Sequence, residues 1–182
     1  KELYNGIKIG YNPVQVTVNK QNYGIFLEED FFDKYLIESN FQRESLIFEI
    51  LRKDSIHFNY LGKDDLLENL SILLSKKIDD KKAKISNIID ENKLIGLLAL
   101  SIIANDGHQL SPINLHWYYN PVSGLMEPIF RESLFYPIKS TSIKETFSNF
   151  KNGNLIIGEF AENIPSIEKK LEFEIIRIKK SY

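Results

Sequence analysis

The stretch HQLSPINLHWYYNPVSGLMEPIFRES, His108 to Ser133, places two histidines, two asparagines and a run of aromatic side chains around one tight turn. Within it, INLHWYY is typical of a strand, NPVSG of a turn and LMEPIF of a returning strand. Because the hairpin returns the chain, Glu132 is expected close to Asn114. The pattern predicts a structural hairpin whose two ends carry the candidates for chemistry.

An apolar segment leads into this hairpin. LIGLLALSIIA, Leu94–Ala104, falls short of the roughly 18 apolar residues that a membrane helix needs. We therefore expect a buried helix from Asp90 to about Ala104, ended by NDG, and no membrane span. A buried helix that ends in a loop is a rigid platform, and catalytic residues often lie on loops supported in this way.

The N-terminal part of the chain predicts a second hairpin. PVQVTV alternates with period two, NKQN supplies turn residues and YGIFLEE resumes as a strand, so Pro13–Glu29 is expected to form two antiparallel strands. DFFDKYLIE then predicts a short helix with Asp30 as its N-cap. Helical spacing places Phe31, Tyr35 and Leu36 on one face of it.

The remaining segments complete an α+β pattern. SLIFEIL, Ser45–Leu51, predicts a strand, and KDDLLENLSILLSKK, Lys63–Lys77, predicts an amphipathic helix with acids in its first turn and lysines in its last. NLIIGEF and LEFEIIRIKK are interpreted as strands. We expect a main domain over residues 1–150 and a small C-terminal β appendage over residues 151–182.

Composition excludes several classes of function. The 182 residues include 23 basic and 25 acidic side chains, a formal net charge of −2, which argues against a protein whose main task is to grip nucleic acid. The sequence has no Cys, which removes disulfides, thiolate zinc sites and a Cys nucleophile. Its three histidines lack helical zinc spacing, and it contains no Gly-rich phosphate loop and no G-x-S-x-G elbow.

Three side chains around the second hairpin remain as candidates. The amide of Asn114 and the carboxylate of Glu132 are hard oxygen ligands suited to Mg²⁺, and Asp106 can act as a base or orient a hydroxyl. Asn114, Glu132 and the nearby His108 also have structural interpretations. Asn114 can bond its own loop, Glu132 can pair with Arg131 or a lysine at the surface, and His108 can bond loop backbone. The residue types alone leave both interpretations open.

Two segments resemble the CotH kinase family, the atypical kinases of the spore-coat type. YGIFLEEDFFDKYLIESNFQRES matches a G-x-[YF]-x-x-E strand end that runs into a helix, with Gly24, Phe26 and Glu29 at the motif positions. HQLSPINLHWYYNPVSGLMEPI resembles an H-x-L-x-x-x-N run followed by an aromatic strand, a turn and a returning strand that ends in P-I. The resemblance covers Tyr11 to about Glu44 and Leu94 to about Tyr136, in the family's order.

The resemblance implies a protein-kinase-like fold, mostly the large lobe with a hairpin of the small lobe. It implies phosphoryl transfer from ATP, with Mg²⁺ or Mn²⁺, to protein side chains such as those of a coat or surface protein, at the cell surface, in the spore coat or after secretion. Asp106 and Asn114 would be catalytic, Asn114 and Glu132 would bind metal, and Glu28 and Glu29 would lie at the hinge near the adenosine.

The chain departs from the family pattern in two places. Glu132 stands where the family commonly has Asp, and the extra methylene moves the carboxylate away from the near-ideal geometry that Mg²⁺ requires. The family's segment with the phosphate-binding Lys precedes the first hairpin, and neither Lys1 nor Lys8 replaces it by position, so we expect incomplete binding of ATP phosphates. The alternatives are a non-catalytic surface or envelope interaction module and a carbohydrate-binding or adhesion domain that uses the aromatic side chains.

Overall fold

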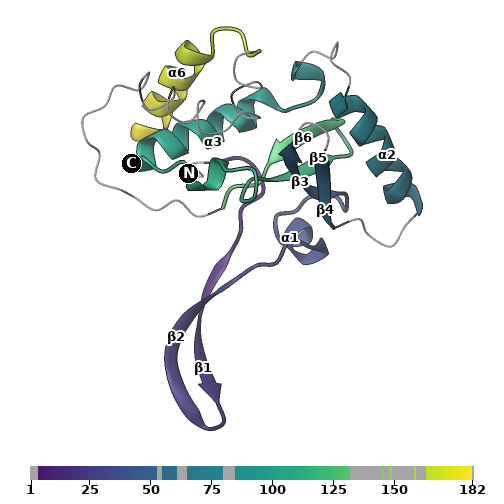
Figure 1. Ribbon diagram of the computed structural model, residues 1–182. Helices are drawn as coiled ribbons and strands as arrows, with labels where there is room; N and C mark the ends of the chain where they lie inside the picture. The colour runs from purple at the N-terminus through teal and green to yellow at the C-terminus, as the bar shows by residue number, and fades with distance from the viewer. Residues whose placement is uncertain are drawn as a thin grey trace.

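The computed structural model describes residues 4–52, 55–60, 65–79, 85–131, 145, 148, 158 and 163–181. In these residues, helices and a sheet form a body, and a long hairpin extends away from it (Figure 1). This hairpin, here called the arm, consists of β1 (Tyr11–Val18) and β2 (Gln21–Glu29). The predicted α+β class and the first predicted hairpin are confirmed.

The sheet of the body is antiparallel, with the strand order β4-β3-β5-β6. Its strands are β3 (Ile47–Arg52), β4 (Ser55–Tyr60), β5 (His116–Asn120) and β6 (Leu125–Pro128). The predicted strand at SLIFEIL and the predicted hairpin HWYY-to-LMEP are confirmed, whereas β4 was not predicted. β5 pairs with β3 on one side and with β6 on the other, so β5 is an inner strand and β6 is at the edge of the sheet.

Apolar side chains on both faces of this sheet are buried. Phe48 and Trp117 belong to a large core cluster on one face, and Ile47 and Tyr118 belong to a smaller cluster on the other. Successive side chains of a strand point to opposite faces, so neighbouring apolar residues are expected only where both faces are covered. The N-terminal segment and the short helix α1 (Lys34–Ser39) supply the smaller cluster with Ile7, Ile9, Leu36 and Ile37.

The large cluster is built around α3 (Glu91–Ala104), the buried helix that the sequence predicted. Asp90 caps its N-terminus by accepting hydrogen bonds from two backbone N–H groups. Asn105, with φ of 51°, ends it in the left-handed conformation that closes many helices. Two amphipathic helices accompany it: α2 (Asp65–Asp79), which confirms the prediction for Lys63–Lys77, and α6 (Ile167–Lys179).

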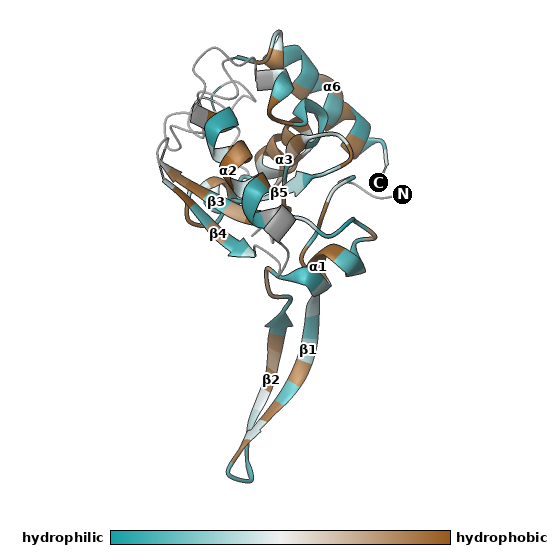
Figure 2. Cartoon of the chain, turned by 90° about the vertical axis from the view of Figure 1, so that its right-hand side faces the viewer, coloured by the Kyte–Doolittle hydropathy of each residue, from teal (hydrophilic) through white to brown (hydrophobic). Residues whose placement is uncertain are grey.

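Among the described residues, no layer covers the arm in this way. Its two-residue turn places Asn19 and Lys20 at positive φ, 51° and 68°, as the right-handed twist of a hairpin favours. A bulge interrupts the register after Val16, opposite Gly24, whose φ of 98° suits glycine. Large apolar side chains are exposed on it, among them Tyr23, Ile25, Phe26 and Leu27. Figure 2 shows hydrophobic residues along both strands of the arm, where it extends from the body. Apart from Tyr11 at its base, which packs against the smaller cluster, the arm lies outside both core clusters.

The helix after the arm begins later than predicted. α1 spans Lys34–Ser39 and its N-cap is Asp33, whose carboxylate accepts the N–H of Tyr35 at 2.8 Å. Asp30 is not the cap, because its carboxylate accepts the N–H of Gly10, also at 2.8 Å, beside the base of the arm. The predicted apolar face is also wrong in part: Leu36 is buried, whereas Phe31 and Tyr35 are exposed.

The prediction of a strand at LEFEIIRIKK is wrong. This segment belongs to α6 (Ile167–Lys179), which packs against α3 (Figure 1). The sequence fits both periods, because Leu171, Phe173 and Ile175 alternate as in a strand, while Leu171, Ile175 and Ile178 lie on one helical face. In the structure, Leu171, Ile175 and Ile178 are buried together in the large cluster, which favours the helix. NLIIGEF, the other expected strand of the appendage, lies outside the described residues apart from Gly158.

No helix in the described part of the chain combines the length and the apolar character needed to cross a bilayer.

Candidate functional site at the junction of arm and body

The loop between α3 and β5 contains two of the predicted site residues, and both bind the backbone of His108. The carboxylate of Asp106 accepts the N–H of His108 at 2.8 Å, and the side-chain amide of Asn114 donates to its carbonyl at 3.1 Å. Asp106 is buried, and His108 itself is exposed. The loop therefore brings Asp106 and Asn114 together around one residue. Asn114 bonds its own loop, as its structural interpretation predicted, and Asp106 orders the same loop.

The contacts of Asn114 also fix which way its amide points. Its Nδ2 donates to the carbonyl of His108 and to Oγ of Ser111, the latter at 2.8 Å. Because a carbonyl oxygen only accepts hydrogen bonds, Nδ2 and not Oδ1 must face it. No hydrogen-bond donor from the described residues reaches Oδ1. An amide oxygen in this situation is a suitable ligand for a hard cation such as Mg²⁺.

His116, at the start of β5, was not predicted as a site residue. Its Nε2 lies 2.7 Å from Oε1 of Glu49, its Nδ1 lies 3.1 Å from the carbonyl oxygen of Asn114, and its ring stacks on Phe32 with the centroids 3.4 Å apart. Glu49 is the residue paired with His116 across β3 and β5, and it also accepts a hydrogen bond from Asn59. The imidazole is thus buried and held on three sides.

Burial lowers the pKa of His116, because the charged ring loses its hydration, and the nearby Arg131 acts in the same direction. The carbonyl of Asn114 and the carboxylate of Glu49 act in the opposite direction. Both ring nitrogens face acceptors, the carbonyl oxygen of Asn114 at Nδ1 and the carboxylate of Glu49 at Nε2.

The base of the arm is tied to the body by an ion pair. Arg131, just after β6, faces Glu29 at the end of β2 with two contacts: Nε to Oε1 at 2.7 Å and Nη2 to Oε2 at 3.0 Å. This hydrogen bonding raises the pKa of Arg131. Glu28 is exposed beside it. Glu28 and Glu29 are the last residues of β2, and α1 begins only at Lys34, so the two acids are not first-turn residues of that helix.

Five residues thus gather where the arm meets the body; we call Glu29, Glu49, Asn114, His116 and Arg131 the junction cluster. Glu132, the other predicted metal ligand, lies outside the described residues, directly after Arg131. Within the described part of the chain, no group of three or more His, Asp or Glu side chains is placed to hold a metal ion. Glu49 and His116 join the cluster through a strand pairing across 67 residues, which no sequence signal marks.

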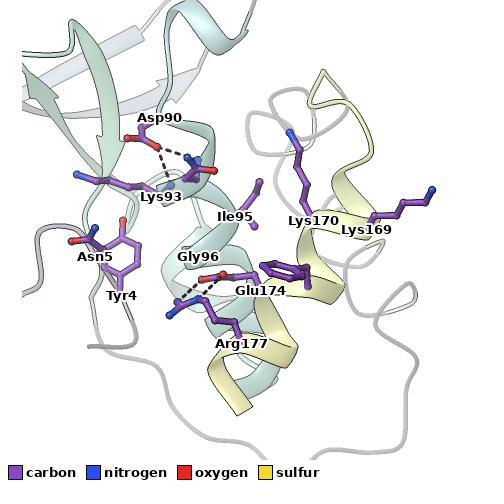
Figure 3. A pocket seen from close by; sticks show the side chains of 12 residues that line it. Tyr4, Asn5, Asp90, Lys93, Ile95, Gly96, Lys169, Lys170, Glu174 and Arg177 are labelled. Atoms are coloured by element: carbon purple, nitrogen blue, oxygen red, sulfur yellow. Dashed lines mark hydrogen bonds and ion pairs between the residues drawn. The ribbon is translucent and has the colours of Figure 1, made fainter. Parts of the chain in front are cut away.

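A separate cavity of about 680 Å³ lies between the N-terminal segment, α3 and α6 (Figure 3). Its charged groups are mostly paired with one another or with the body: Glu174 with Arg177, Lys170 with Glu91, and Lys93 with Glu127. No predicted site residue lines it. The lining side chains are Tyr4, Asn5, Asp90, Asn92, Lys93, Ile95, Gly96, Lys169, Lys170, Phe173, Glu174 and Arg177.

No family model matches the chain, and no curated protein is similar to it at a significant level. The resemblance to the CotH kinase family therefore rests on the two segments quoted above.

Proposed function

We propose that this chain is a CotH-type kinase domain that transfers phosphoryl groups from ATP, with a divalent metal, to protein side chains. The observation that carries the proposal is the orientation of Asn114, whose Nδ2 is held by its own loop and whose Oδ1 has no donor among the described residues. The resemblance assigns this residue to the metal. Its loop adjoins the base of the arm through His116 and Arg131, as a site between two lobes requires.

The resemblance suggests the roles of the other residues. Asn114 and Glu132 would hold Mg²⁺ or Mn²⁺, which when bound neutralises charge on the phosphates. Glu28, which is exposed at the end of β2, would contact the adenosine, whereas Glu29 is engaged by Arg131 and would hold the base of the arm. Asp106 orders the catalytic loop through the N–H of His108, and orienting a protein hydroxyl is the role it would add.

A second candidate function has an observation of its own. The arm exposes Ile25, Phe26 and Leu27 in succession, so both of its faces are apolar. Contiguous exposed apolar surface of this kind commonly marks an interaction site. In a kinase this surface would belong to the sheet of the small lobe. In a non-catalytic interaction module it would contact another protein of the surface or envelope.

Calorimetric titration with ATP, with and without Mg²⁺ or Mn²⁺, separates the two functions. The variants are Asn114→Ala and Glu132→Ala, and the matched control is Asn92→Ala, which removes an exposed amide at the start of α3, away from the junction cluster. The kinase proposal predicts metal-dependent heat that both site variants lose and the control keeps. A folded protein that gives no heat under any condition would contradict it and favour the interaction module.

A further inference from the structure

The arm is a two-stranded ribbon that extends clear of the body in both views (Figures 1 and 2). Within the described residues, β1 and β2 pair only with each other. A two-stranded hairpin is marginally stable in water, and a third strand makes it more stable. Ile25 and Leu27 of β2 are 78% and 68% exposed. The arm would therefore gain stability from pairing with a further strand.

The register of the arm shows which backbone groups face away from it. Hydrogen-bonded and non-hydrogen-bonded pairs alternate along an antiparallel ladder. At the base of the arm the N–H of Asp30 donates to the carbonyl of Gly10 at 3.1 Å, so this pair is hydrogen-bonded. Further along the register, Pro13 and Leu27 form a non-hydrogen-bonded pair, which suits a proline because it has no N–H. Leu27, and Ile25 two residues before it, therefore direct their N–H and carbonyl groups outward from β2.

The two outer edges of the arm differ in how they are protected. Edge strands commonly carry proline or charged residues that prevent further pairing. On the β1 edge, Pro13 removes one outward donor. On the β2 edge, residues 21–27 include neither a proline nor a charged residue, and the bulge near the tip leaves Ile25–Glu29 in regular register. The β2 edge is therefore the one open to a further strand.

The charges at the two ends of β2 indicate which strand this is. Lys20 lies in the turn at the tip, Glu28 lies near the base, and both are exposed. A second copy of β2 in antiparallel orientation brings Lys20 of each copy toward Glu28 of the other. A parallel orientation would bring like charges together. An interface with two-fold symmetry uses the same surface on both copies, and this edge is complementary to itself.

We propose that this chain forms a symmetric dimer in which the β2 edges of two copies pair antiparallel and join the two arms into one four-stranded sheet. With Ile25 opposite Ile25 at the two-fold axis, outward backbone groups meet outward backbone groups and Leu27 lies opposite Tyr23. Lys20 then lies diagonally across from Glu28 of the other copy, at a separation that a lysine side chain spans. The inference goes beyond the proposed function, since it needs neither nucleotide nor metal.

The geometry of the arm also limits the size of the assembly. Because the arm extends clear of the body, antiparallel pairing places the two bodies at opposite ends of the shared sheet (Figure 1). The outer strands of that sheet are the two copies of β1, each with Pro13 on its free edge. Assembly should therefore stop at two copies.

Sedimentation equilibrium over a range of protein concentrations, together with backbone hydrogen exchange by NMR, is the first test. We expect a monomer–dimer equilibrium. The amides of Ile25 and Leu27 should be protected at high concentration and should exchange freely on dilution, whereas the amide of Gln15, on the β1 edge, exchanges freely throughout. A monomer at every concentration, a larger assembly, or a dimer without this protection overturns the proposal. Protection of the two amides that does not depend on concentration also overturns it.

Reversal of the charges tests the orientation. Lys20→Glu and Glu28→Lys each convert two attractive contacts of the dimer into two repulsive ones, so the dimer Kd should rise about tenfold at low salt. An equimolar mixture of the two variants should dimerise again, because every contact between them is then attractive. Lys169→Glu, at an exposed lysine of α6, is the control and should leave the Kd unchanged. A mixture that dimerises no better than either variant alone overturns the antiparallel pairing.

A pair of proline variants tests the edge itself. Leu27→Pro removes an outward N–H from β2, and Gln15→Pro removes one from β1, while both leave the hydrogen bonds between the two strands of the arm in place. We expect Leu27→Pro to abolish the dimer and Gln15→Pro to keep it, with NMR spectra that confirm a folded body in both. Equal effects of the two variants on the dimer overturn the assignment to the β2 edge.

Discussion

In the β5–β6 hairpin, Trp117 and Tyr118 point to opposite faces of the sheet and both are fully buried, whereas in the β1–β2 arm Ile25 and Phe26 also point to opposite faces and both are exposed. Similar local signals, apolar strands on either side of a turn, produced both hairpins. What differs is the cover: β3, α3 and α1 enclose the first, and the described residues provide no layer over the second. The local sequence pattern determines that a hairpin forms, and tertiary contacts determine whether its apolar side chains are buried or exposed.

The largest expected effect compares one aromatic residue from each hairpin. Trp117→Ala empties the large cluster and should cost about 3 to 5 kcal/mol in the free energy of unfolding, because both the transfer of the ring and the remaining cavity count against the fold. Phe26→Ala, at a side chain that is 51% exposed, should cost less than about 1 kcal/mol. Urea unfolding of both variants measures the difference. Equal losses would contradict the view that the arm contributes little to the core.

A smaller effect is expected at the ion pair behind the body hairpin. Glu127 is buried in β6, where it pairs with Lys93 of α3 and accepts a hydrogen bond from Asn120 at 2.7 Å. Lys93→Met keeps the aliphatic stem but leaves the carboxylate without a cation, which should cost about 3 kcal/mol. Chemical denaturation measures it, and the double variant with Glu127→Gln should recover part of the loss. A neutral effect of Lys93→Met would show that Glu127 is not held as a buried charge.

At the base of the arm the expected effect on stability is smaller still. Arg131 and Glu29 are 28% and 31% exposed, so removing this pair by Arg131→Gln should cost about 1 kcal/mol or less. Hydrogen exchange should show where it acts, with faster exchange in β1 and β2 and no change in β5 and β6. Arg177→Gln, which removes another Arg–Glu pair on α6, is the matched control. Faster hydrogen exchange throughout the body after Arg131→Gln would contradict the view that the ion pair between Arg131 and Glu29 stabilises the arm alone.

The smallest expected effect is a dependence of stability on pH, caused by His116 at the start of β5 in the body hairpin. The pKa of His116 is lowered from 6.5 in the folded protein, so the unfolded chain binds a proton first as the pH falls. Its contribution to stability is therefore present above about pH 6.5 and is lost as the pH falls through the folded pKa. Urea unfolding at a series of pH values should show that the free energy of unfolding decreases as the pH falls in the native protein, and that this slope is absent in His116→Asn. The exposed His57→Asn is the control, and a slope unchanged by His116→Asn would contradict the assignment.

Most of the secondary structure of the body and of the arm could be predicted from the sequence. Asp90 and Asn105 mark the ends of α3 with ordinary capping chemistry, and the turn at Asn19 and Lys20 closes the arm. α6 was missed because its apolar residues satisfy a strand period and a helix period at once. Only packing against α3 distinguishes the two.

Only some residues of the candidate site could be predicted from the sequence. Asn114 and Glu29 were predicted from residue type and resemblance, and the structure brings both to the base of the arm. Glu49 and His116 were missed because their contact is created by the pairing of β3 with β5, which no local pattern specifies. Periodicity predicts which face a side chain occupies, but not which residue lies opposite it.

The central claim is that the junction cluster binds a divalent metal and nucleotide through Asn114. Paramagnetic broadening by Mn²⁺ in the presence of ATP, observed in the NMR spectrum of the chain, tests it most directly. The account predicts that the backbone amide signals of Asn114, His116 and Arg131 broaden first, while those of the arm turn at Asn19 and Lys20 stay sharp. A folded protein whose junction signals remain sharp, or whose broadening centres on the cavity between α3 and α6, would contradict it.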